Sequence, residues 1–290
     1  MEFLRPATLA EALALKAGRP DAVPIAGGTD VMVELNFDHR RPAALLDLTR
    51  VPELATWSTV ESSDGTVRLG AGVPYSRVIA ELGEAVPALA MASRTVGSPQ
   101  IRNRGTVGGN LGAASPAGDT HPVLLALDAR VEVASVRGTR LLRAEEFYVG
   151  VKRHALEPDE LITAVHLPAH AGPQQFAKVG TRNAMVIAVC SFALCLREGR
   201  VGAAIGSAAP TPRRAREAED FLAAELPWTS PAPLPDSLKR RFGDLVGEAA
   251  APIDDVRGSA AYRKHALGVL ARRTLTWAWD EHRTGERACA

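Results

Sequence analysis

Cysteine is scarce in this sequence, which has only Cys190, Cys195 and Cys289 among its 290 residues. An iron–sulfur cluster needs about four thiolates held together, so the chain cannot build such a centre by itself. Cys190 and Cys195 are an odd number of residues apart in one expected strand, which sends their side chains to opposite faces of the sheet. We therefore expect both to be small core residues and neither to ligate a metal.

The sequence also lacks a charge excess and a long apolar run. Its 34 basic and 33 acidic residues give a formal net charge of +1, so no broad field attracts nucleic acid or an anionic membrane. No segment approaches the roughly twenty apolar residues that cross a bilayer, and residues 1–6 contain no apolar signal region. We expect a soluble cytoplasmic protein with no membrane span and no nucleic-acid partner.

Common catalytic and metal-binding motifs are absent as well. The sequence has no Gly-x4-Gly-Lys-Ser/Thr loop and no Gly-x-Ser-x-Gly elbow, which argues against a P-loop nucleotidase and a serine hydrolase. Residues 70–72, Gly-Ala-Gly, begin like a dinucleotide-binding fingerprint, but Tyr75 stands at its third glycine position, so we expect a turn. His166 and His170 are spaced i,i+4, yet Pro168 breaks the helix that a metal site with this spacing would need. These patterns give no catalytic residue and no metal ligand.

Glycine, in contrast, is concentrated in two loops, 24–30 (Pro-Ile-Ala-Gly-Gly-Thr-Asp) and 106–119. Glycine lets backbone N–H groups approach an anion, because it has no Cβ and adopts positive φ. The first loop joins an expected strand at 23–26 to an amphipathic helix capped by Thr29 or Asp30, and a helix N-terminus is where a phosphate binds. Each loop alone is also consistent with an ordinary turn, whereas the two together favour a ligand with an extended charged middle, a dinucleotide.

Hydrophobic periodicity divides the chain into three units. The first unit ends at about residue 55. It begins with a helix that starts at the capping box Thr8-Leu9-Ala10-Glu11 and ends at Gly18, and buried strands follow at 23–26 and 43–48. In the second unit we expect strands at 67–69, 130–136 and 161–167 and helices at 76–82, 87–95 and 121–127. In the third we expect an antiparallel strand pair at 186–196 and 201–209 and helices at 213–224, 235–249 and 259–282. Strands followed by helices indicate a separate α+β domain at the C-terminal end.

Several motifs together resemble one known family. Ala-Gly-Gly-Thr-Asp at 26–30, Thr-Val-Gly-Gly-Asn at 106–110 and Ser-Pro-Ala-Gly-Asp at 115–119 are similar to the FAD-binding subunits of molybdenum hydroxylases, of the xanthine dehydrogenase and carbon monoxide dehydrogenase type. The similarity continues in order through 159–162, 176–182, 208–215 and a helix that begins at 259. It therefore covers nearly the whole chain, and the paired glycine loops are its specific part.

The resemblance implies an α+β fold with two domains. The first, over residues 1–170, is a two-subdomain FAD-binding fold of the PCMH type, with subdomains at about 1–55 and 56–170. The second, over residues 171–290, is a C-terminal α+β domain with an antiparallel sheet and helices. Neither glycine loop contains a histidine or cysteine to which a flavin could be linked, so the implied FAD is noncovalent.

The resemblance also implies the residues of the FAD site. The pyrophosphate is wrapped by Pro24, Ile25, Ala26, Gly27, Gly28, Thr29, Asp30 and Val31. The pocket is completed by Thr106, Gly109, Asn110, Ala113 and Asp119, with Asp119 as acceptor for a ribose or ribityl hydroxyl. Ile162 provides an apolar contact to the ring system, and Lys178 lies beside the flavin, where a cation raises its reduction potential. The simpler alternatives are a helix N-cap for Asp119 and a solvated sheet lysine for Lys178.

The implied function is electron transfer in a complex of the xanthine dehydrogenase-like type. Electrons come from a [2Fe-2S] partner subunit, fed by a molybdopterin-binding subunit that hydroxylates the organic substrate, and leave through FAD to NAD+ or another acceptor. In the branch that uses NAD+, acidic residues follow the arginine that corresponds to Arg182, whereas residues 183–185 here are uncharged, so the acceptor stays open. Two alternatives remain: a stand-alone flavin reductase or oxidase of the same fold, and a non-catalytic nucleotide-binding module.

Overall fold

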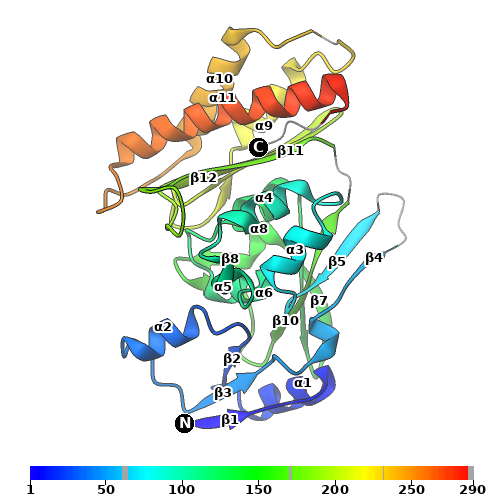
Figure 1. Ribbon diagram of the computed structural model, residues 1–290, viewed down its shortest axis with the longest axis vertical. Coiled ribbons are helices and arrows are strands. Elements are labelled where there is room, and N and C mark those ends of the chain that lie inside the picture. Colours follow the sequence, from blue (N-terminus) through cyan, green and yellow to red (C-terminus); the bar gives the residue numbers. More distant parts are fainter. Residues whose placement is uncertain (61–64, 170–171, 231, 287–290) are drawn as a thin grey trace.

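A computed structural model describes residues 1–60, 65–169, 172–230 and 232–286. They form three units that follow one another along the long axis of the molecule in chain order (Figure 1). Within the described residues, the buried apolar side chains gather in three clusters. None of the helices in this part of the chain has the length and apolarity needed to cross a membrane.

The N-terminal unit contains a three-stranded parallel sheet in the order β1-β3-β2. Its elements are β1 (Glu2–Leu4), α1 (Leu9–Gly18), β2 (Val23–Ile25), α2 (Val31–Asn36), β3 (Ala44–Asp47) and the 3-10 helix η1 (Pro52–Leu54). As predicted, α1 follows Thr8, whose hydroxyl accepts a hydrogen bond from the N–H of Glu11 at 3.2 Å. In a capping box the Glu11 carboxylate would accept a hydrogen bond from the N–H of Thr8. Here it accepts instead from the N–H of Ala7, one residue earlier, at 2.7 Å.

The middle unit is built on a five-stranded antiparallel sheet in the order β4-β5-β10-β6-β7. Its strands are β4 (Trp57–Val60), β5 (Thr66–Gly70), β6 (Arg130–Ser135), β7 (Gly138–Arg143) and β10 (Leu161–Pro168), with the small hairpin β8 (Tyr148–Gly150) and β9 (Arg153–His154) beside them. The three strands predicted from the sequence are the three central ones, which carry most of the buried side chains. The edge strands β4 and β7 are mostly exposed and therefore show no apolar pattern.

Short helices cover this sheet, and all of them except the one at residues 99–102 contribute side chains to its apolar cluster. They are α3 (Tyr75–Glu81), α4 (Pro87–Thr95), α5 (Pro99–Arg102), α6 (Val107–Ala113), α7 (His121–Ala126) and α8 (Ala144–Phe147). The predicted helices correspond to α3, α4 and α7. The Gly-Ala-Gly sequence at 70–72 leads into a turn before α3, as predicted, and it passes close to η1: a Cβ on Gly70 would lie only 2.4 Å from the carbonyl oxygen of Leu54.

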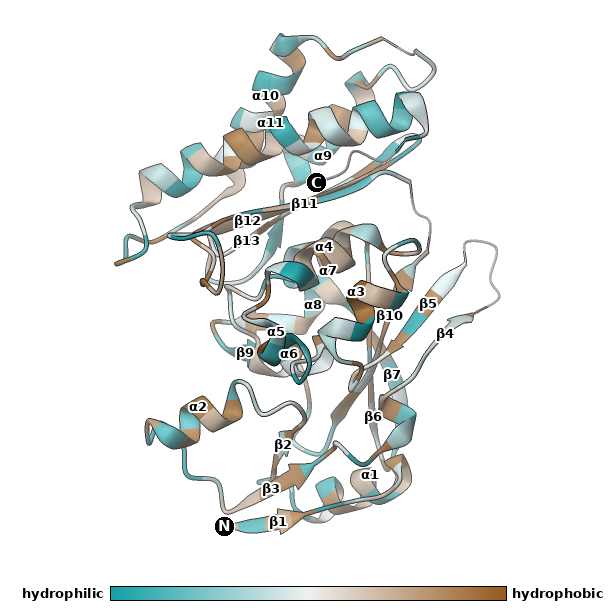
Figure 2. Cartoon of the chain, viewed as in Figure 1, coloured by the Kyte–Doolittle hydropathy of each residue, from teal (hydrophilic) through white to brown (hydrophobic). Residues whose placement is uncertain are grey.

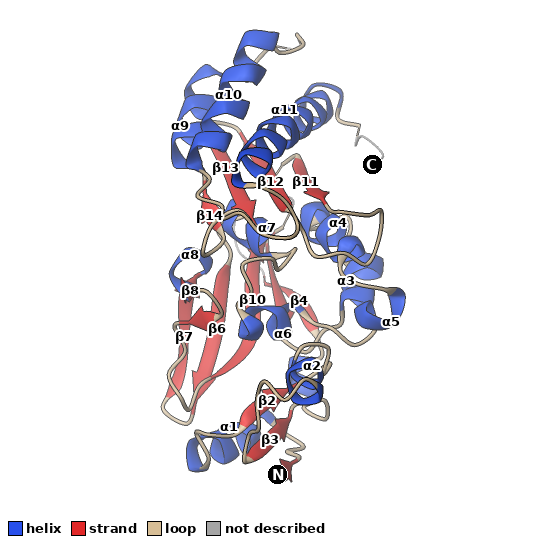
Figure 3. Cartoon of the chain, turned by 90° about the vertical axis from the view of Figure 1, so that its left-hand side faces the viewer, coloured by secondary structure: helices blue, strands red, loops and turns tan. Residues whose placement is uncertain are grey.

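The C-terminal unit has a four-stranded antiparallel sheet with buried surfaces on both sides. Its elements are β11 (Gln174–Val179), β12 (Cys190–Arg197), β13 (Arg200–Gly206), β14 (Arg213–Arg214), α9 (Arg216–Glu225), α10 (Asp236–Ala249) and α11 (Ala260–Thr284). Figure 3 shows α9, α10 and α11 on one side of this sheet and α4 and α7 of the middle unit on the other. Cys190 packs with the C-terminal helices and Cys195 with the middle unit, so the predicted opposite orientation of the two cysteines is confirmed.

Two expectations for this unit were wrong in detail. The sheet has four strands rather than a pair, and β12 begins at Cys190 instead of 186. The helix expected at 213–224 begins only at Arg216, because Arg213 and Arg214 pair with β13 as the short strand β14. The helices expected at 235–249 and 259–282 correspond to α10 and α11 within two residues. The domain limits near residues 55 and 170 stay predictions.

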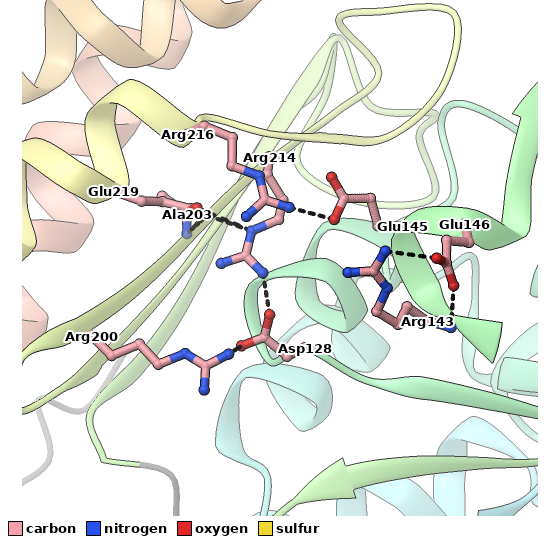
Figure 4. A network of polar contacts seen from close by, with 9 residues as sticks. All are labelled: Asp128, Arg143, Glu145, Glu146, Arg200, Ala203, Arg214, Arg216 and Glu219. Carbon is pink, nitrogen blue, oxygen red and sulfur yellow. Dashed lines mark hydrogen bonds and ion pairs between the residues drawn. The ribbon is translucent and has the colours of Figure 1, made fainter. Parts of the chain in front are cut away.

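A polar network joins the middle and C-terminal units (Figure 4). Asp128, which follows α7, accepts hydrogen bonds from Arg197 and Arg200 at 2.8 Å each and a further one from Arg214. Arg214 also donates to Glu219 of α9 at 2.8 Å, and its side chain is only 7% exposed. The C-terminal sheet is therefore fixed to the middle unit by charged groups as well as by apolar packing.

Candidate functional site

The first glycine loop connects β2 to α2 through a conformation that requires glycine. Gly28 has φ +76°, a left-handed conformation that side chains with a Cβ rarely adopt. The helix begins after Asp30, as predicted, and the N–H of Met32 donates to the carbonyl of Gly28 at 3.0 Å. The predicted cap is wrong in one respect, since the Asp30 side chain accepts no capping hydrogen bond.

The first loop leaves several backbone donors available. The N–H groups of Gly27, Gly28 and Thr29 form no hydrogen bond with any other residue that the structure describes. All three residues are partly exposed rather than covered by other elements. Three successive donors at the start of a helix are a geometry that suits the oxygens of a phosphate group.

The second glycine segment is less of a loop than the sequence suggested. Residues Val107–Ala113 form α6, so the predicted continuous loop over 106–119 is wrong for its first half. The helix forms because Thr106 caps it, its hydroxyl accepting from the N–H of Gly109 at 2.9 Å. Glycine is required at 108 for packing instead: a Cβ there would lie 2.5 Å from the Cβ of Ala71.

One side of α6 remains open. Gly109 and Gly112 are exposed, and Asn110 and Ala113 are partly exposed, whereas Gly108 and Leu111 on the other side are buried. The Oδ1 atom of Asn110 accepts a hydrogen bond from the hydroxyl of Thr120 at 3.0 Å, which holds α6 to the start of α7.

The two glycine segments meet in the folded chain. A Cβ on Gly27 would lie 1.9 Å from the carbonyl oxygen of Arg104, two residues before Thr106. A pocket of about 150 Å³ lies between them, lined by Ala26 and Gly27 of the first loop and by Arg104 and Thr106 next to α6. Residues about eighty positions apart, which the sequence could only suggest as partners, therefore border one pocket.

Asp119 and Lys178 form a buried ion pair between the middle and C-terminal units. The Nζ atom of Lys178 donates to Oδ2 of Asp119 at 2.6 Å and to the carbonyl oxygen of Thr95 at 3.1 Å. The side chains of Lys178 and Asp119 are only 8% and 7% exposed. The alternative of a solvated sheet lysine is therefore wrong for Lys178.

Asp119 is neither a helix cap nor fully satisfied. The N-cap of α7 is Thr120, so the capping alternative for Asp119 is wrong. Its Oδ2 atom also accepts from the hydroxyl of Thr95 at 3.0 Å, while its buried Oδ1 atom has no hydrogen-bond partner among the described residues. Burial raises the pKa of Asp119 above its ordinary value, and the neighbouring Lys178 ammonium acts in the opposite direction. An unpartnered buried carboxylate oxygen is a place where a ligand hydroxyl can donate.

Ile162 lies under α6. It belongs to β10, is 9% exposed, and its Cδ1 atom would be 3.9 Å from a Cβ added to Gly112. The structure thus places this predicted apolar contact beside the open face of α6. No group of three or more potential metal ligands is found within the described residues, and His166 instead binds Glu132 at 2.7 Å. His170, the other half of the rejected histidine pair, lies outside the described residues.

Sequence reasoning missed Thr95, Arg104 and His121. Thr95 is the last residue of α4 and contacts both members of the ion pair, but no motif distinguishes it. His121 is fully buried, and its Nδ1 atom shares a hydrogen bond of 2.6 Å with the hydroxyl of Tyr148. Burial lowers the pKa of His121 to about 3, so the imidazole is neutral at ordinary pH. Its proximity to Gly118 becomes visible only in the fold.

Comparison with known proteins identifies the class to which this fold and site belong. Residues 1–170 match the family model described as the FAD binding domain in molybdopterin dehydrogenase, and residues 175–278 match the CO dehydrogenase flavoprotein C-terminal domain. The chain belongs to this family of FAD-binding proteins from molybdenum hydroxylases. Its relatives are oxidoreductase subunits, so the predicted enzyme class is confirmed.

Individual relatives match over nearly their full length. The chain is 32% identical to the putative xanthine dehydrogenase FAD-binding subunit XdhB of Escherichia coli K12, covering 94% of each chain. It is 32% identical to the nicotine 6-hydroxylase medium subunit of Paenarthrobacter nicotinovorans, covering 95% of this chain and 96% of the other. Among solved structures, a chain of carbon monoxide dehydrogenase from Hydrogenophaga pseudoflava matches with a TM-score of 0.86 and 27% identity, covering 96% and 97%. These likenesses confirm the predicted α+β fold of a FAD-binding domain followed by a C-terminal domain.

Proposed function

We propose that this chain holds FAD noncovalently between its two glycine segments and passes electrons from an iron–sulfur partner subunit to NAD+ or another acceptor. The observation that carries the proposal is the close approach of Gly27 to Arg104, through which Ala26 and Gly27 of the first loop and Thr106, the cap of α6, line one pocket. Backbone donors at a helix start suit the pyrophosphate of a dinucleotide.

The residues present fit this cofactor. In the proposal, the pyrophosphate lies against Pro24, Ile25, Ala26, Gly27, Gly28, Thr29, Asp30 and Val31. Thr106, Gly109, Asn110 and Ala113 complete the pocket along α6, and Ile162 supports the ring system from β10. The unpartnered Oδ1 atom of Asp119 accepts a hydrogen bond from a ribose or ribityl hydroxyl.

Lys178 has an electrostatic role in this proposal. Bound flavin supplies the capacity to exchange one or two electrons, and the protein tunes that capacity through nearby charge. The Lys178 ammonium is held in place by Asp119 and Thr95, so it offers a fixed positive charge at the boundary of the two units. A fixed, nearly buried charge is screened less by solvent than a surface lysine.

The partners in the proposal are an iron–sulfur subunit and a molybdopterin-binding subunit, assembled with this chain in the cytoplasm. Two observations support them: a relative is named as a medium subunit, and the described residues contain no metal-binding cluster of their own. The xanthine dehydrogenase FAD-binding subunit among the relatives favours a xanthine dehydrogenase-like complex.

Purification under native conditions tests the cofactor. The protein should be yellow, and acid or heat should release intact FAD, because only hydrogen bonds and packing hold it. Gly28→Val should remove the flavin, since valine strains the φ of +76° at this position. Gly18→Ala is the matched control, because no atom lies within 4 Å of its added Cβ. Flavin retained in Gly28→Val would contradict the proposed pyrophosphate site.

Reconstitution tests the electron-transfer role against the alternatives. The flavin-loaded chain alone should not oxidise xanthine to uric acid, and oxidation should appear when iron–sulfur and molybdenum subunits are added. Sustained turnover of xanthine by the chain alone would favour a self-sufficient flavoenzyme of the same fold. A colourless protein that binds a nucleotide without any redox activity would favour the non-catalytic binding module.

A further inference from the structure

A second pocket lies at the opposite end of the molecule, between α10 and α11. The two helices lie close together at Gly243, where an added Cβ would be 2.7 Å from the carbonyl oxygen of Gly268, and at Gly247, where it would be 3.2 Å from that of Lys264. Beside these contacts the two helices border a cavity of about 460 Å³ that is open to solvent. It is lined by Asp236, Lys239, Arg240, Val269, Arg272, Arg273, Thr276 and Trp277. No residue of the two glycine segments belongs to this wall.

The cavity wall carries an uncompensated positive charge. Its one carboxylate, Asp236, is bound to Lys239 at 2.7 Å. Arg240, Arg272 and Arg273 form no ion pair with any carboxylate of the described residues. By contrast, Arg241, the neighbour of Arg240, does not line the cavity and pairs with Glu248 at 3.6 Å. Three arginines therefore line one hollow, and none of them forms an ion pair with a described carboxylate, although Arg240 lies near enough to Asp236 to help Lys239 lower the pKa of that carboxyl.

An aromatic side chain completes the wall. Trp277 is 38% exposed, although tryptophan is a large apolar residue that folding normally covers. Together with residues 269, 272, 273 and 276 it follows the i, i+3, i+4 spacing along α11, so these side chains share one stripe of that helix. Figure 2 shows hydrophilic residues along both α10 and α11, in contrast to the more hydrophobic strands beneath them.

We propose that this cavity is an anion site for a nucleotide-type ligand, with its phosphate groups bound by Arg240, Arg272 and Arg273 and its planar ring stacked on Trp277. Guanidinium groups present paired donors that match the geometry of phosphate oxygens. The cavity volume falls within the range of roughly 300–1,000 Å³ that small-molecule sites occupy. Because its lining is separate from the glycine segments, the site is additional to the proposed FAD site and does not depend on it.

Titration calorimetry with ADP as the probe tests the proposal. The protein is loaded with FAD first, so that ADP cannot occupy the flavin pocket. We expect saturable binding that weakens as salt is added, because charge drives it. The double variant Arg240→Gln/Arg273→Gln should bind ADP at least tenfold more weakly. Arg241→Gln, a change of the same kind on the same helix, should bind ADP like the wild-type protein.

A second comparison separates the ring contact from the phosphate contact. Trp277→Leu should weaken ADP binding severalfold while leaving inorganic pyrophosphate binding unchanged. Equal effects on both probes would overturn the assignment of the ring to Trp277. Absent ADP binding, or equal affinity in the double variant, would overturn the site as a whole. Binding of polyglutamate without binding of ADP would also overturn it, since the groove would then be a docking surface for an acidic protein segment. Flavin content measured in each sample shows whether the variants remain folded.

Discussion

Lys178 and Asp119 are two opposite charges that the fold removes almost completely from water. The Lys178 ammonium opposes the upward shift that burial gives the pKa of Asp119, and Thr95 adds a hydrogen bond to either side of the pair. Removing one member of such a pair leaves the other buried without compensation, which is far more costly than losing a surface ion pair. A substitution of Lys178 will therefore lower the stability of the protein whatever its role. Only a change in the reduction potential of the flavin would show that Lys178 acts on the cofactor.

Lys178→Met should lower the reduction potential of the bound flavin, because it removes a positive charge and keeps a stem of similar volume. A lost interaction of about 1.4 kcal/mol corresponds to roughly 59 mV for one electron, so a decrease of some tens of millivolts is expected. Dye equilibration measures the potential, and Lys264→Met, at an exposed position on α11, serves as the control. An unchanged potential would place Lys178 away from the ring and leave the ion pair a structural contact.

His121 should make the protein sensitive to acid. Its pKa is about 3 in the folded chain against 6.5 for the free side chain, because burial disfavours the imidazolium. The unfolded chain therefore binds one more proton between these values, and stability falls as the pH drops through this window by up to about 1.4 kcal/mol per pH unit. His121→Gln removes the titration and leaves a hydrogen-bonding group opposite Tyr148. Urea unfolding at about pH 6 and pH 4 should show a shallower loss of stability in the variant than in the wild type. Parallel losses would show that His121 is not the responsible group.

Among single residues, the resemblance implied that Asp119 and Lys178 belong to the FAD site, which stays a prediction, but it did not indicate that they form an ion pair. Nothing in a sequence shows that a lysine in β11 will meet an aspartate 59 positions earlier, since this depends on how the sheet lies against α4 and α7. The same limit applies to Thr95, whose role comes entirely from its position at the end of α4. Asp119 was expected to accept a cofactor hydroxyl, and that expectation stays a prediction.

At the level of elements, local signals predicted the buried strands, the long helices and the first glycine loop, but not the helix in the second glycine segment. The Thr-Val-Gly-Gly-Asn sequence at 106–110 has a poor helix propensity, yet α6 forms because Thr106 caps it and Leu111 is buried beneath it. Tertiary packing therefore overrides propensity here. The edge strands β4 and β7 could not be predicted because most of their side chains are exposed to solvent. Their sequences therefore show no periodic pattern of apolar residues.

Gly27→Ala tests whether contact between the two glycine segments holds the pocket together. The added methyl group would lie 1.9 Å from the carbonyl oxygen of Arg104, so the backbone of one segment must shift. We expect a destabilisation of about 1–3 kcal/mol and at least tenfold weaker FAD binding in this variant. Equilibrium dialysis gives the affinity, and urea unfolding gives the stability. If FAD affinity is the same as in Gly18→Ala, contact between the segments is not needed for binding.

For the molecule as a whole, the sequence predicted three units in chain order, but not how they are joined. The C-terminal sheet contacts α9, α10 and α11 on one face and the middle unit on the other, which accounts for the continuous apolar run in β12 and β13. The charged junction at Asp128 had no sequence signal, since Arg197, Arg200 and Arg214 look like surface arginines until the two units meet. Long-range pairing of this kind is a property of the fold.

Asp128→Asn should show how much this junction contributes to the stability of the assembled units. Asparagine tolerates the left-handed φ of 53° at this position, so the substitution removes charge without adding backbone strain. The nearly buried Arg214 then loses one of its two carboxylate partners, and we expect a loss of about 2 kcal/mol in the free energy of unfolding. Glu145→Gln is the matched control, because Glu145 and Arg216 bridge the same two units with exposed side chains, a kind of pair that contributes less than about 1 kcal/mol. Urea unfolding of both variants measures the difference, and equal losses would mean that the apolar packing of the sheet on α4 and α7, rather than the arginine network, joins the units.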